Sequence, residues 1–190
     1  MKTKLLILTL LLSLAFYSCK ETKNETVKET SNTTEKIDKG QSAVIDKDSE
    51  PNALQVAASL DDFKTLVVAV KAAELENALV NAGPLTVFAP VNGAFDKLPK
   101  GTVAALLKPE NKDQLAFILK NHVAPANYTV ATLDKNVRKK RKLYMASGKY
   151  LEVTKEGDHL FVGGTKILKS VKVSNGWIHV IGDVLVPSDK

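Results

Sequence analysis

The feature that most limits how this chain can fold is a stretch of 32 residues, 19–50, with almost no core-forming side chains. Its only large apolar residues are Val27, Ile37, Val44 and Ile45. Such a segment cannot bury enough apolar surface to offset the entropy that it would lose on becoming ordered. We therefore expect a flexible tether over residues 19–50, with a root-mean-square reach of roughly 30 Å, followed by a folded domain over residues 51–190.

The composition changes where this domain begins. All seven prolines lie in residues 51–190, which carry 19 basic and 13 acidic residues, a net charge of +6. The whole chain is 44% hydrophobic and 25% charged, as soluble globular proteins are, and this excludes a fibrous repeat and a polytopic membrane protein. Because the chain has one cysteine, an intrachain disulfide and a multi-cysteine zinc site are also excluded.

Residues 1–18 have the layout of a secretory signal peptide. Lys2 and Lys4 precede an apolar run, Leu5–Tyr17, that is too short to span a bilayer comfortably. A buried N-terminal helix is the alternative, but such a helix should have a polar face, and this run has none. We therefore expect the segment to be a secretion signal.

The cysteine, Cys19, follows Ser18 directly. This junction resembles a bacterial lipobox, whose cysteine becomes the lipidated first residue of the mature protein; a free cysteine beside a cleavage site is the alternative. Two or three acyl chains would hold the protein stably at a membrane. Lys20-Glu21 resembles the export signal of surface lipoproteins in the Bacteroidetes. We expect lipid attachment at Cys19 and secretion across the inner membrane to the cell envelope, at the periplasmic or surface face of the outer membrane.

The domain starts with helical patterns. Ser59 is a candidate N-cap for a helix whose apolar face contains Phe63, Leu66 and Val70. The run Leu85–Pro90 predicts a short buried strand, and Asn92 is a candidate cap for the short helix after it.

The second half of the domain has strand patterns. We expect strands over Tyr150–Lys155 and His159–Val162, joined by a Gly157-Asp158 turn. Trp177–Val186 is apolar on both faces, which is typical of a central strand. Helices followed by a run of antiparallel strands predict an α+β domain.

Two segments of this domain resemble the signature boxes of the fasciclin domain. Gly83–Pro99, GPLTVFAPVNGAFDKLP, is similar to the first box and Asn175–Pro187, NGWIHVIGDVLVP, to the second. Pro109–Thr129 is similar to the segment between them. The resemblance implies an antiparallel β-wedge of roughly seven strands flanked by several helices, and an extracytoplasmic adhesion or matrix role. Integrin recognition is not implied, because Asn121 replaces the tyrosine that usually precedes the histidine.

The three histidines are the candidates for acid–base or metal chemistry. The patterns place His122 on the apolar face of a helix and His179 in an apolar strand, where a hydrogen-bonded core histidine is the usual role. His159 follows a turn and should be solvated. The sequence has no metal-ligand spacing around them and no G-x-S-x-G, Walker A or G-x-G-x-x-G motif. We therefore expect no catalytic residue, no metal and no cofactor.

Five consecutive cations carry almost the whole net charge of the domain: Arg138, Lys139, Lys140, Arg141 and Lys142. Such a run must be solvated, so we expect it in a loop or at the entrance of a strand. It is either an ordinary exposed connection or a docking site for an anionic partner. Nucleic acid is not expected, because no recognition helix and no interleaved aromatic residues accompany the run.

These features predict a monomeric, non-enzymatic, lipid-anchored adhesion or interaction module. Its expected partners are the membrane, through lipid on Cys19, and an anionic polysaccharide, lipopolysaccharide or surface protein. The alternative is a binding protein or sensor for a small apolar ligand or a cell-envelope component. An apolar pocket of a few hundred Å³ would support that alternative.

Overall fold

The computed structural model describes residues 50–80 and 83–187. The expected signal peptide and nearly all of the expected tether, residues 1–49, lie outside the described residues. Short helices make up most of the first half of the domain: α1 (Ala53–Ser59), the 3₁₀ turn η2 (Asp61–Phe63), α2 (Lys64–Ala72), α3 (Glu76–Val80), α4 (Asn92–Asp96), α5 (Thr102–Leu106), the 3₁₀ turn η3 (Pro109–Asn111), α6 (Lys112–Lys120) and α7 (Val130–Arg138).

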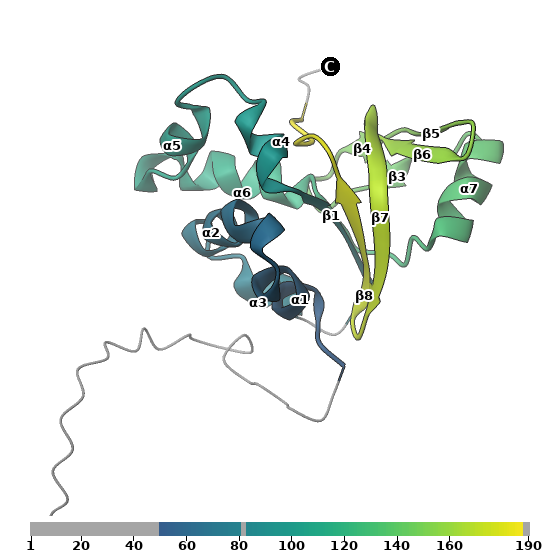
Figure 1. Cartoon of the computed structure of the whole chain (residues 1–190), viewed down its shortest axis with the longest axis horizontal. Coiled ribbons are helices and arrows are strands. Elements are labelled where there is room, and N and C mark those ends of the chain that lie inside the picture. The colour runs from purple at the N-terminus through teal and green to yellow at the C-terminus, as the bar shows by residue number, and fades with distance from the viewer. Residues whose placement is uncertain (1–49, 81–82, 188–190) are drawn as a thin grey trace, which may run out of the picture. The chain divides into compact units, whose positions relative to one another are not determined.

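The strands of the described residues form one large sheet and one hairpin. The sheet has the order β2-β1-β8-β7-β6-β5, and β3 pairs with β4 (Figure 1). The strands are β1 (Leu85–Pro90), β2 (Val123–Ala124), β3 (Leu143–Tyr144), β4 (Tyr150–Leu151), β5 (Val153–Glu156), β6 (His159–Val162), β7 (Thr165–Val173) and β8 (Gly176–Ile181). The predicted α+β class and the wedge of strands flanked by helices are confirmed, but the prediction that the strands are all antiparallel was wrong, because β1 and β8 pair in parallel.

Strands β1 and β8 lie side by side in the middle of the sheet and run parallel, whereas the other paired strands are antiparallel. Their register runs from Leu85 opposite Gly176 to Pro90 opposite Ile181. The two segments that resemble the fasciclin boxes therefore form the two central strands. The predicted central position of the second box is confirmed, although its strand ends at Ile181 and not at Val186.

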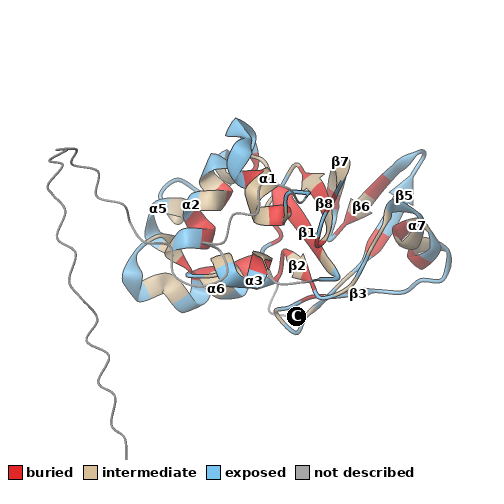
Figure 2. Ribbon diagram, turned by 90° about the horizontal axis from the view of Figure 1, so that it is seen from below, coloured by how far each residue is buried: buried red, intermediate tan, exposed pale blue. Residues whose placement is uncertain are grey.

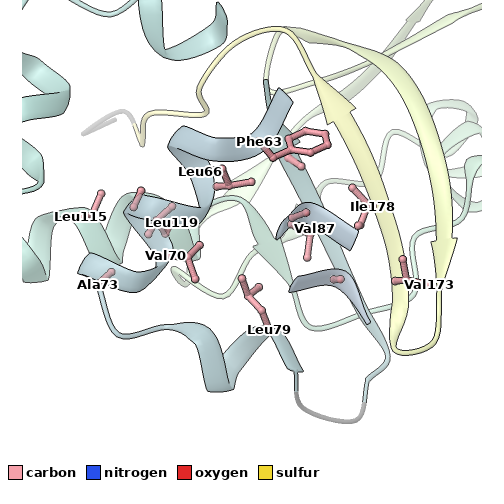
Figure 3. Packing of buried hydrophobic residues seen from close by; sticks show 14 residues of the cluster. Phe63, Leu66, Val70, Ala73, Leu79, Val87, Leu115, Leu119, Val173 and Ile178 are labelled. Atoms are coloured by element: carbon pink, nitrogen blue, oxygen red, sulfur yellow. The ribbon is translucent and has the colours of Figure 1, made fainter. Parts of the chain in front are cut away.

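The central strands are buried on both faces, so their alternating side chains enter two different cores. Val87 of β1 and Ile178 of β8 pack against α1, α2, α3 and α6; Figure 3 shows these side chains facing Leu66, Val70 and Leu79 of the helices. Phe88 and Ile181 belong to a second core with residues of α7, β5 and β6. Figures 1 and 2 show α1 to α6 on one side of the central strands and α7 on the other, beside β5.

The turn before β8 is hydrogen-bonded to β1 and to the helices α1 and α3. The Asn175 carbonyl accepts a hydrogen bond from Leu85 N–H at 3.0 Å. Its side-chain Oδ1 accepts from Ala53 N–H at 3.0 Å, and its Nδ2 donates to the Leu79 carbonyl at 2.8 Å. One buried amide therefore holds the start of α1 and the end of α3 to the sheet. The next residue must be glycine, because a Cβ on Gly176 would collide with the Leu85 carbonyl.

The prediction for the first helix was wrong in its boundaries. Ser59 does not cap the helix that carries Phe63; it is the last residue of an unpredicted helix, α1. Asn52 starts that helix through a capping box with Gln55, in which each side chain bonds the other's backbone N–H at 2.9 Å. The Asn-x-x-Gln spacing is a known start signal that could have revealed α1. The predicted apolar face is confirmed, since Phe63, Leu66 and Val70 are buried.

The prediction that Asn92 caps the helix after β1 was also wrong. The N-cap of α4 is Val91, whose side chain makes no capping hydrogen bond. Asn92 lies one residue further on, where its Oδ1 accepts from Thr65 N–H at 3.0 Å and its Nδ2 donates to the Asp61 carbonyl at 2.8 Å. Asn92, in α4, therefore provides a hydrogen-bond acceptor for a backbone N–H at the start of α2.

We expect Gly176→Ala to lower the free energy of unfolding by at least about 3 kcal/mol. The added methyl group collides with backbone at Leu85, which no side-chain rotation can relieve, and Gly176 has a φ of +148° that other residues rarely adopt. Denaturant unfolding of the full chain measures the change.

The matched control is Gly93→Ala, at an exposed helical position where an added Cβ meets nothing within 4 Å. It should be neutral or stabilising by up to about 1 kcal/mol. A Gly176→Ala variant as stable as Gly93→Ala would show that β1 and β8 do not depend on the close approach.

Candidate functional site

His122 follows α6 and is buried, with both ring nitrogens in hydrogen bonds. Its Nδ1 donates to the Ile118 carbonyl at 2.9 Å, and its Nε2 accepts from Leu185 N–H at 2.8 Å. Only the neutral ring can make both bonds. Burial lowers the pKa of His122 from 6.5 to about 4, although the Ile118 hydrogen bond acts in the opposite direction. His122 is therefore a structural residue, and the prediction of a hydrogen-bonded core histidine is confirmed.

His179 in β8 is held in the same manner. Its Nε2 donates to the Tyr128 carbonyl at 2.7 Å, and its Nδ1 lies 2.7 Å from the Ser170 hydroxyl, which donates to it. The ring stacks on Phe88, with centroids 5.4 Å apart. Burial lowers its pKa as well. His159 is exposed, as predicted, so the histidines are not gathered into one site.

Asn121, the position where the family resemblance expects a tyrosine, is fully buried. Its Nδ2 donates to the Leu185 carbonyl at 3.0 Å, and its Oδ1 accepts from the Ser147 hydroxyl at 2.8 Å. The side chain joins the end of α6 to the β3–β4 loop and to the segment after β8. It is not available on the surface for recognition, and sequence reasoning missed this internal role.

Two apolar pockets border the helical half of the domain. One lies between α1, α2, α3 and β1, and the other lies between α4, α5, α6 and the segment after β8. Each holds about 150 Å³. Sites for drug-sized ligands span roughly 300–1,000 Å³, so neither pocket has the size that the alternative of a small apolar ligand requires.

The run of five cations begins on an unpredicted helix. Thr129 caps α7 by accepting a hydrogen bond from Thr132 N–H at 3.1 Å. Within α7, Leu133 is buried, and Arg138 is the last residue. A threonine cap followed by apolar Leu133 and Val137, four residues apart, was the available signal. The rest of the run connects α7 to β3, and all five residues are exposed, so the predicted exposed connection at a strand entrance is confirmed from Lys139 onward.

The backbone leaves α7 through a Schellman motif centred on Lys140. Lys140 N–H donates to the Val137 carbonyl at 3.1 Å, and Arg141 N–H donates to the Asn136 carbonyl at 2.9 Å. Lys140 has a φ of +52°, in the left-handed region that glycine normally occupies in this motif. The turn redirects the chain so that the next cations lie over β5.

A groove of about 380 Å³ lies between this turn and β5, and we call it the basic groove. Its lining residues are Val137, Lys140, Arg141, Lys142, Glu152, Val153, Thr154 and Lys155. Four cations and one carboxylate thus surround two valines. Sequence reasoning identified three of these cations; Lys155 joins them only because β5 packs against α7.

Ion pairs divide the cations into two groups. Arg138 lies 3.3 Å from Asp134 and Lys142 lies 3.1 Å from Glu152. Lys139, Lys140 and Arg141 have no carboxylate within 4.0 Å among the described residues. The same Asp134 also pairs with Lys155 at 2.9 Å, and these lysine and arginine contacts hold its pKa below the usual range. Three adjacent positive charges are therefore not neutralised by any carboxylate of the described residues.

An exposed tyrosine pair lies on the strands that follow the run. Tyr144 and Tyr150 are opposite each other in the β3–β4 hairpin, with ring centroids 5.3 Å apart. They are 46% and 63% exposed. Two exposed aromatic residues therefore follow the basic run in the folded domain, although none is interleaved within it.

Some of the expected features cannot be located. Cys19, the expected site of lipid attachment, lies outside the described residues. Within residues 50–80 and 83–187, no group of three or more acidic, histidine or cysteine side chains could hold a metal ion, and no helix is long and apolar enough to cross a membrane.

Comparisons with known proteins identify sequences and a solved structure that this chain resembles. The family model of the fasciclin domain matches residues 61–187. Protein sll1483 of Synechocystis sp. is 44% identical over 159 residues, which cover 82% of this chain and 83% of that protein. Transforming growth factor-beta-induced protein ig-h3 of Sus scrofa is 33% identical over 138 residues, covering 72% of this chain but 19% of that protein. A solved FAS1 domain pair from the insect cell adhesion molecule Fasciclin I aligns with 65% of this chain and 45% of that one, at 20% identity and a TM-score of 0.49.

We expect the free energy of unfolding to fall as the pH decreases from about 6.5 to about 4. Because the pKa of His122 is lowered to about 4 in the folded state, the unfolded chain takes up a proton in this range and the folded chain does not. This histidine accounts for up to about 3 kcal/mol, present in full above pH 6.5 and lost toward pH 4. Denaturant unfolding at closely spaced pH values measures it.

His122→Gln should remove the contribution of His122, up to about 3 kcal/mol, from this dependence of the free energy of unfolding on pH. His159→Gln, at an exposed position, should leave the dependence unchanged. His179 continues to titrate in both variants. Glu74, Asp134 and Asp183 also have lowered pKa values; their contribution is present above the ordinary values, 4.5 for Glu74 and 3.8 for the two aspartates, and fades as the pH falls past them. A His122→Gln variant with the full dependence of the original chain would contradict the assignment.

Proposed function

Because the chain belongs to the fasciclin domain family, we propose that it is a non-enzymatic extracytoplasmic module for adhesion or surface interaction. An adhesion or matrix role is the one that the family resemblance implies. The buried histidines support a binding role over a catalytic one, since both ring nitrogens of His122 and of His179 are already in internal hydrogen bonds.

We further propose that the domain is tied to the cell envelope through lipid on Cys19. The signal-like residues 1–18 and the lipobox-like junction support this anchor. The polar tether over residues 19–50 would let the domain reach roughly 30 Å from the membrane. Many copies on one surface would multiply contacts that are weak individually. The outer membrane is the proposed location.

The observation that carries the binding role is the set of three exposed cations beside the basic groove, Lys139, Lys140 and Arg141, which have no carboxylate within 4.0 Å in the part of the chain that the structure describes. Exposed charges without internal partners do little for folding but set up a field that attracts anionic surfaces. The proposed partner is accordingly an anionic component of the envelope or its surroundings. Binding of a small apolar ligand is less well supported, because the apolar pockets hold only about 150 Å³ each.

We expect Cys19→Ala to move the protein from the membrane fraction to the soluble fraction, or to leave its signal uncleaved. Lipid attachment needs the cysteine thiol, and alanine removes it without altering the apolar run. Fractionation of cells that express the tagged chain measures the change. Ser18→Ala, which keeps a small residue before the cysteine, is the control, and equal membrane partition of Cys19→Ala with the signal removed would contradict the anchor.

We expect the triple substitution Lys139→Gln, Lys140→Gln and Arg141→Gln to abolish most salt-dependent attachment to carboxylate-coated beads. Attachment of the unchanged chain should weaken strongly between about 0.05 M and about 0.5 M NaCl, because exposed charges are screened. The free energy of unfolding should change by less than about 1 kcal/mol.

The matched control removes the same charge from a different strand. Lys166, Lys169 and Lys172 lie on β7 and do not line the basic groove; changing them to glutamine should leave attachment largely intact. Equal loss in both triple variants would mean that net charge, and not this surface, causes attachment. Attachment insensitive to salt and to both variants would exclude the proposed electrostatic role.

A further inference from the structure

Lys140 has a left-handed backbone conformation, which is more favourable for glycine than for lysine. Its φ is +52°, and glycine is the usual residue at this position of a Schellman motif. A residue held in such a conformation at the edge of a groove indicates a functional constraint when its side chain makes no compensating contact. Lys140 has no carboxylate within 4.0 Å in the described residues, so the fold gains no ion pair from the lysine.

The basic groove combines cations with apolar surface. Val137 and Val153 line the groove together with Lys140, Arg141 and Lys155. The groove also contains Glu152, which pairs with Lys142 at 3.1 Å, and the exposed Thr154. A ligand suited to this lining has separated negative charges, hydroxyl groups and apolar C–H faces.

The tyrosine pair extends this surface along the β3–β4 hairpin. Leu143 and Leu151 point into the core, so their neighbours Tyr144 and Tyr150 face outward. Lys142 and Glu152 are the next two residues opposite each other in this register. They form an ion pair and, like the tyrosines, lie on the outward face. Lys142, directly before β3, and Tyr144 are two residues apart, about 6.6 Å for extended chain, so an extended polymer leaving the groove would meet the two rings.

We propose that the basic groove and the Tyr144–Tyr150 pair together bind an acidic polysaccharide of the polyuronate class. Lys140 and Arg141 bind carboxylates of successive sugars, and the rings pack against the C–H faces of the sugars beyond them. This inference rests on the proposed function, because it names the partner of the same exposed cations.

The charge pattern favours a polyuronate over other polyanions. Duplex DNA carries one negative charge per about 1.7 Å of its axis, a density that would press phosphates against Glu152 within the groove. An anionic membrane offers a flat array of headgroups, whereas these cations border a groove. A polyuronate has one carboxylate per sugar, with hydroxyls between them that Glu152 and Thr154 can bind.

The test measures binding of the full chain to alginate, with dextran as the uncharged polysaccharide. Alginate should bind at about 0.15 M NaCl and dextran should not. Lys140→Gln with Arg141→Gln should weaken alginate binding at least about tenfold, while the charge-matched Lys169→Gln with Lys172→Gln should change it less than about twofold.

The tyrosines separate this inference from simple charge attraction. Tyr144→Ala with Tyr150→Ala should weaken alginate binding about tenfold, whereas Tyr144→Phe with Tyr150→Phe, which keep the rings, should retain most of it. Equal binding to duplex DNA or to phosphatidylglycerol vesicles, with no effect of the alanine pair, would overturn the polyuronate inference and leave the proposed function standing. No binding to any polyanion or to carboxylate-coated beads would overturn both.

The strained turn supplies a second measurement. Lys140→Gly should raise the denaturant midpoint and weaken alginate binding at the same time. Glu74, the other described non-glycine residue with positive φ, at +54°, also ends a helix through a Schellman motif but pairs with Lys112 at 2.6 Å. Glu74→Gly should raise the midpoint without affecting alginate. Unchanged binding in Lys140→Gly would remove Lys140 from the site.

Discussion

The parallel contact between β1 and β8 is the constraint on which the rest of the domain depends. These strands are 91 residues apart in register, from Leu85 opposite Gly176 to Pro90 opposite Ile181, so their pairing closes a loop that contains the elements from α4 to β7. The backbones approach so closely at the Leu85–Gly176 end that no side chain fits there. The Asn175 amide then ties α1 and α3 to the same corner. One corner thus fixes the register of the central strands and the position of the first helices.

Burial of these two strands on both faces determines how the remaining elements are arranged. The helices α1 to α6 cover one face, and α7 with β5 and β6 encloses the other. Buried polar groups occur where elements meet, and each has its hydrogen-bond partners: His179 between β8, β7 and Tyr128, and Asn121 with His122 around Leu185. In the described residues no buried side-chain nitrogen or oxygen lacks a partner. The buried polar side-chain groups of the described residues are therefore all used in hydrogen bonds within the fold. Polar groups that could bind other molecules lie on the surface.

The surface at the end of α7 differs from this interior because one of its residues lowers the stability of the fold. Cations near a helix C-terminus are stabilised by the helix dipole, so the basic run does not oppose the folding of α7. The left-handed conformation of Lys140 does oppose it, because glycine would fit better. Natural sequences break local rules of this kind chiefly at functional sites. The proposed polyuronate binding would account together for the strain at Lys140, the neighbouring cations that lack a carboxylate partner among the described residues, and the exposed tyrosines.

The sequence alone determined the α+β class, the buried strand of the first box, the central strand of the second box and the solvation of the basic run, because each depends on local patterns. Periodic apolar residues identified the face of Phe63, Leu66 and Val70, and the doubly apolar second box could belong only in a central strand. The helices α1 and α7 were missed although Asn52 and Thr129 cap them, because helices this short have weak periodicity and depend on packing for stability. Only the tertiary structure decided that β1 and β8 run parallel, that Asn121 is internal, and that Lys155 and the tyrosine pair join the basic run. Those contacts connect residues distant in sequence, and local propensity carries no information about which distant residues will meet.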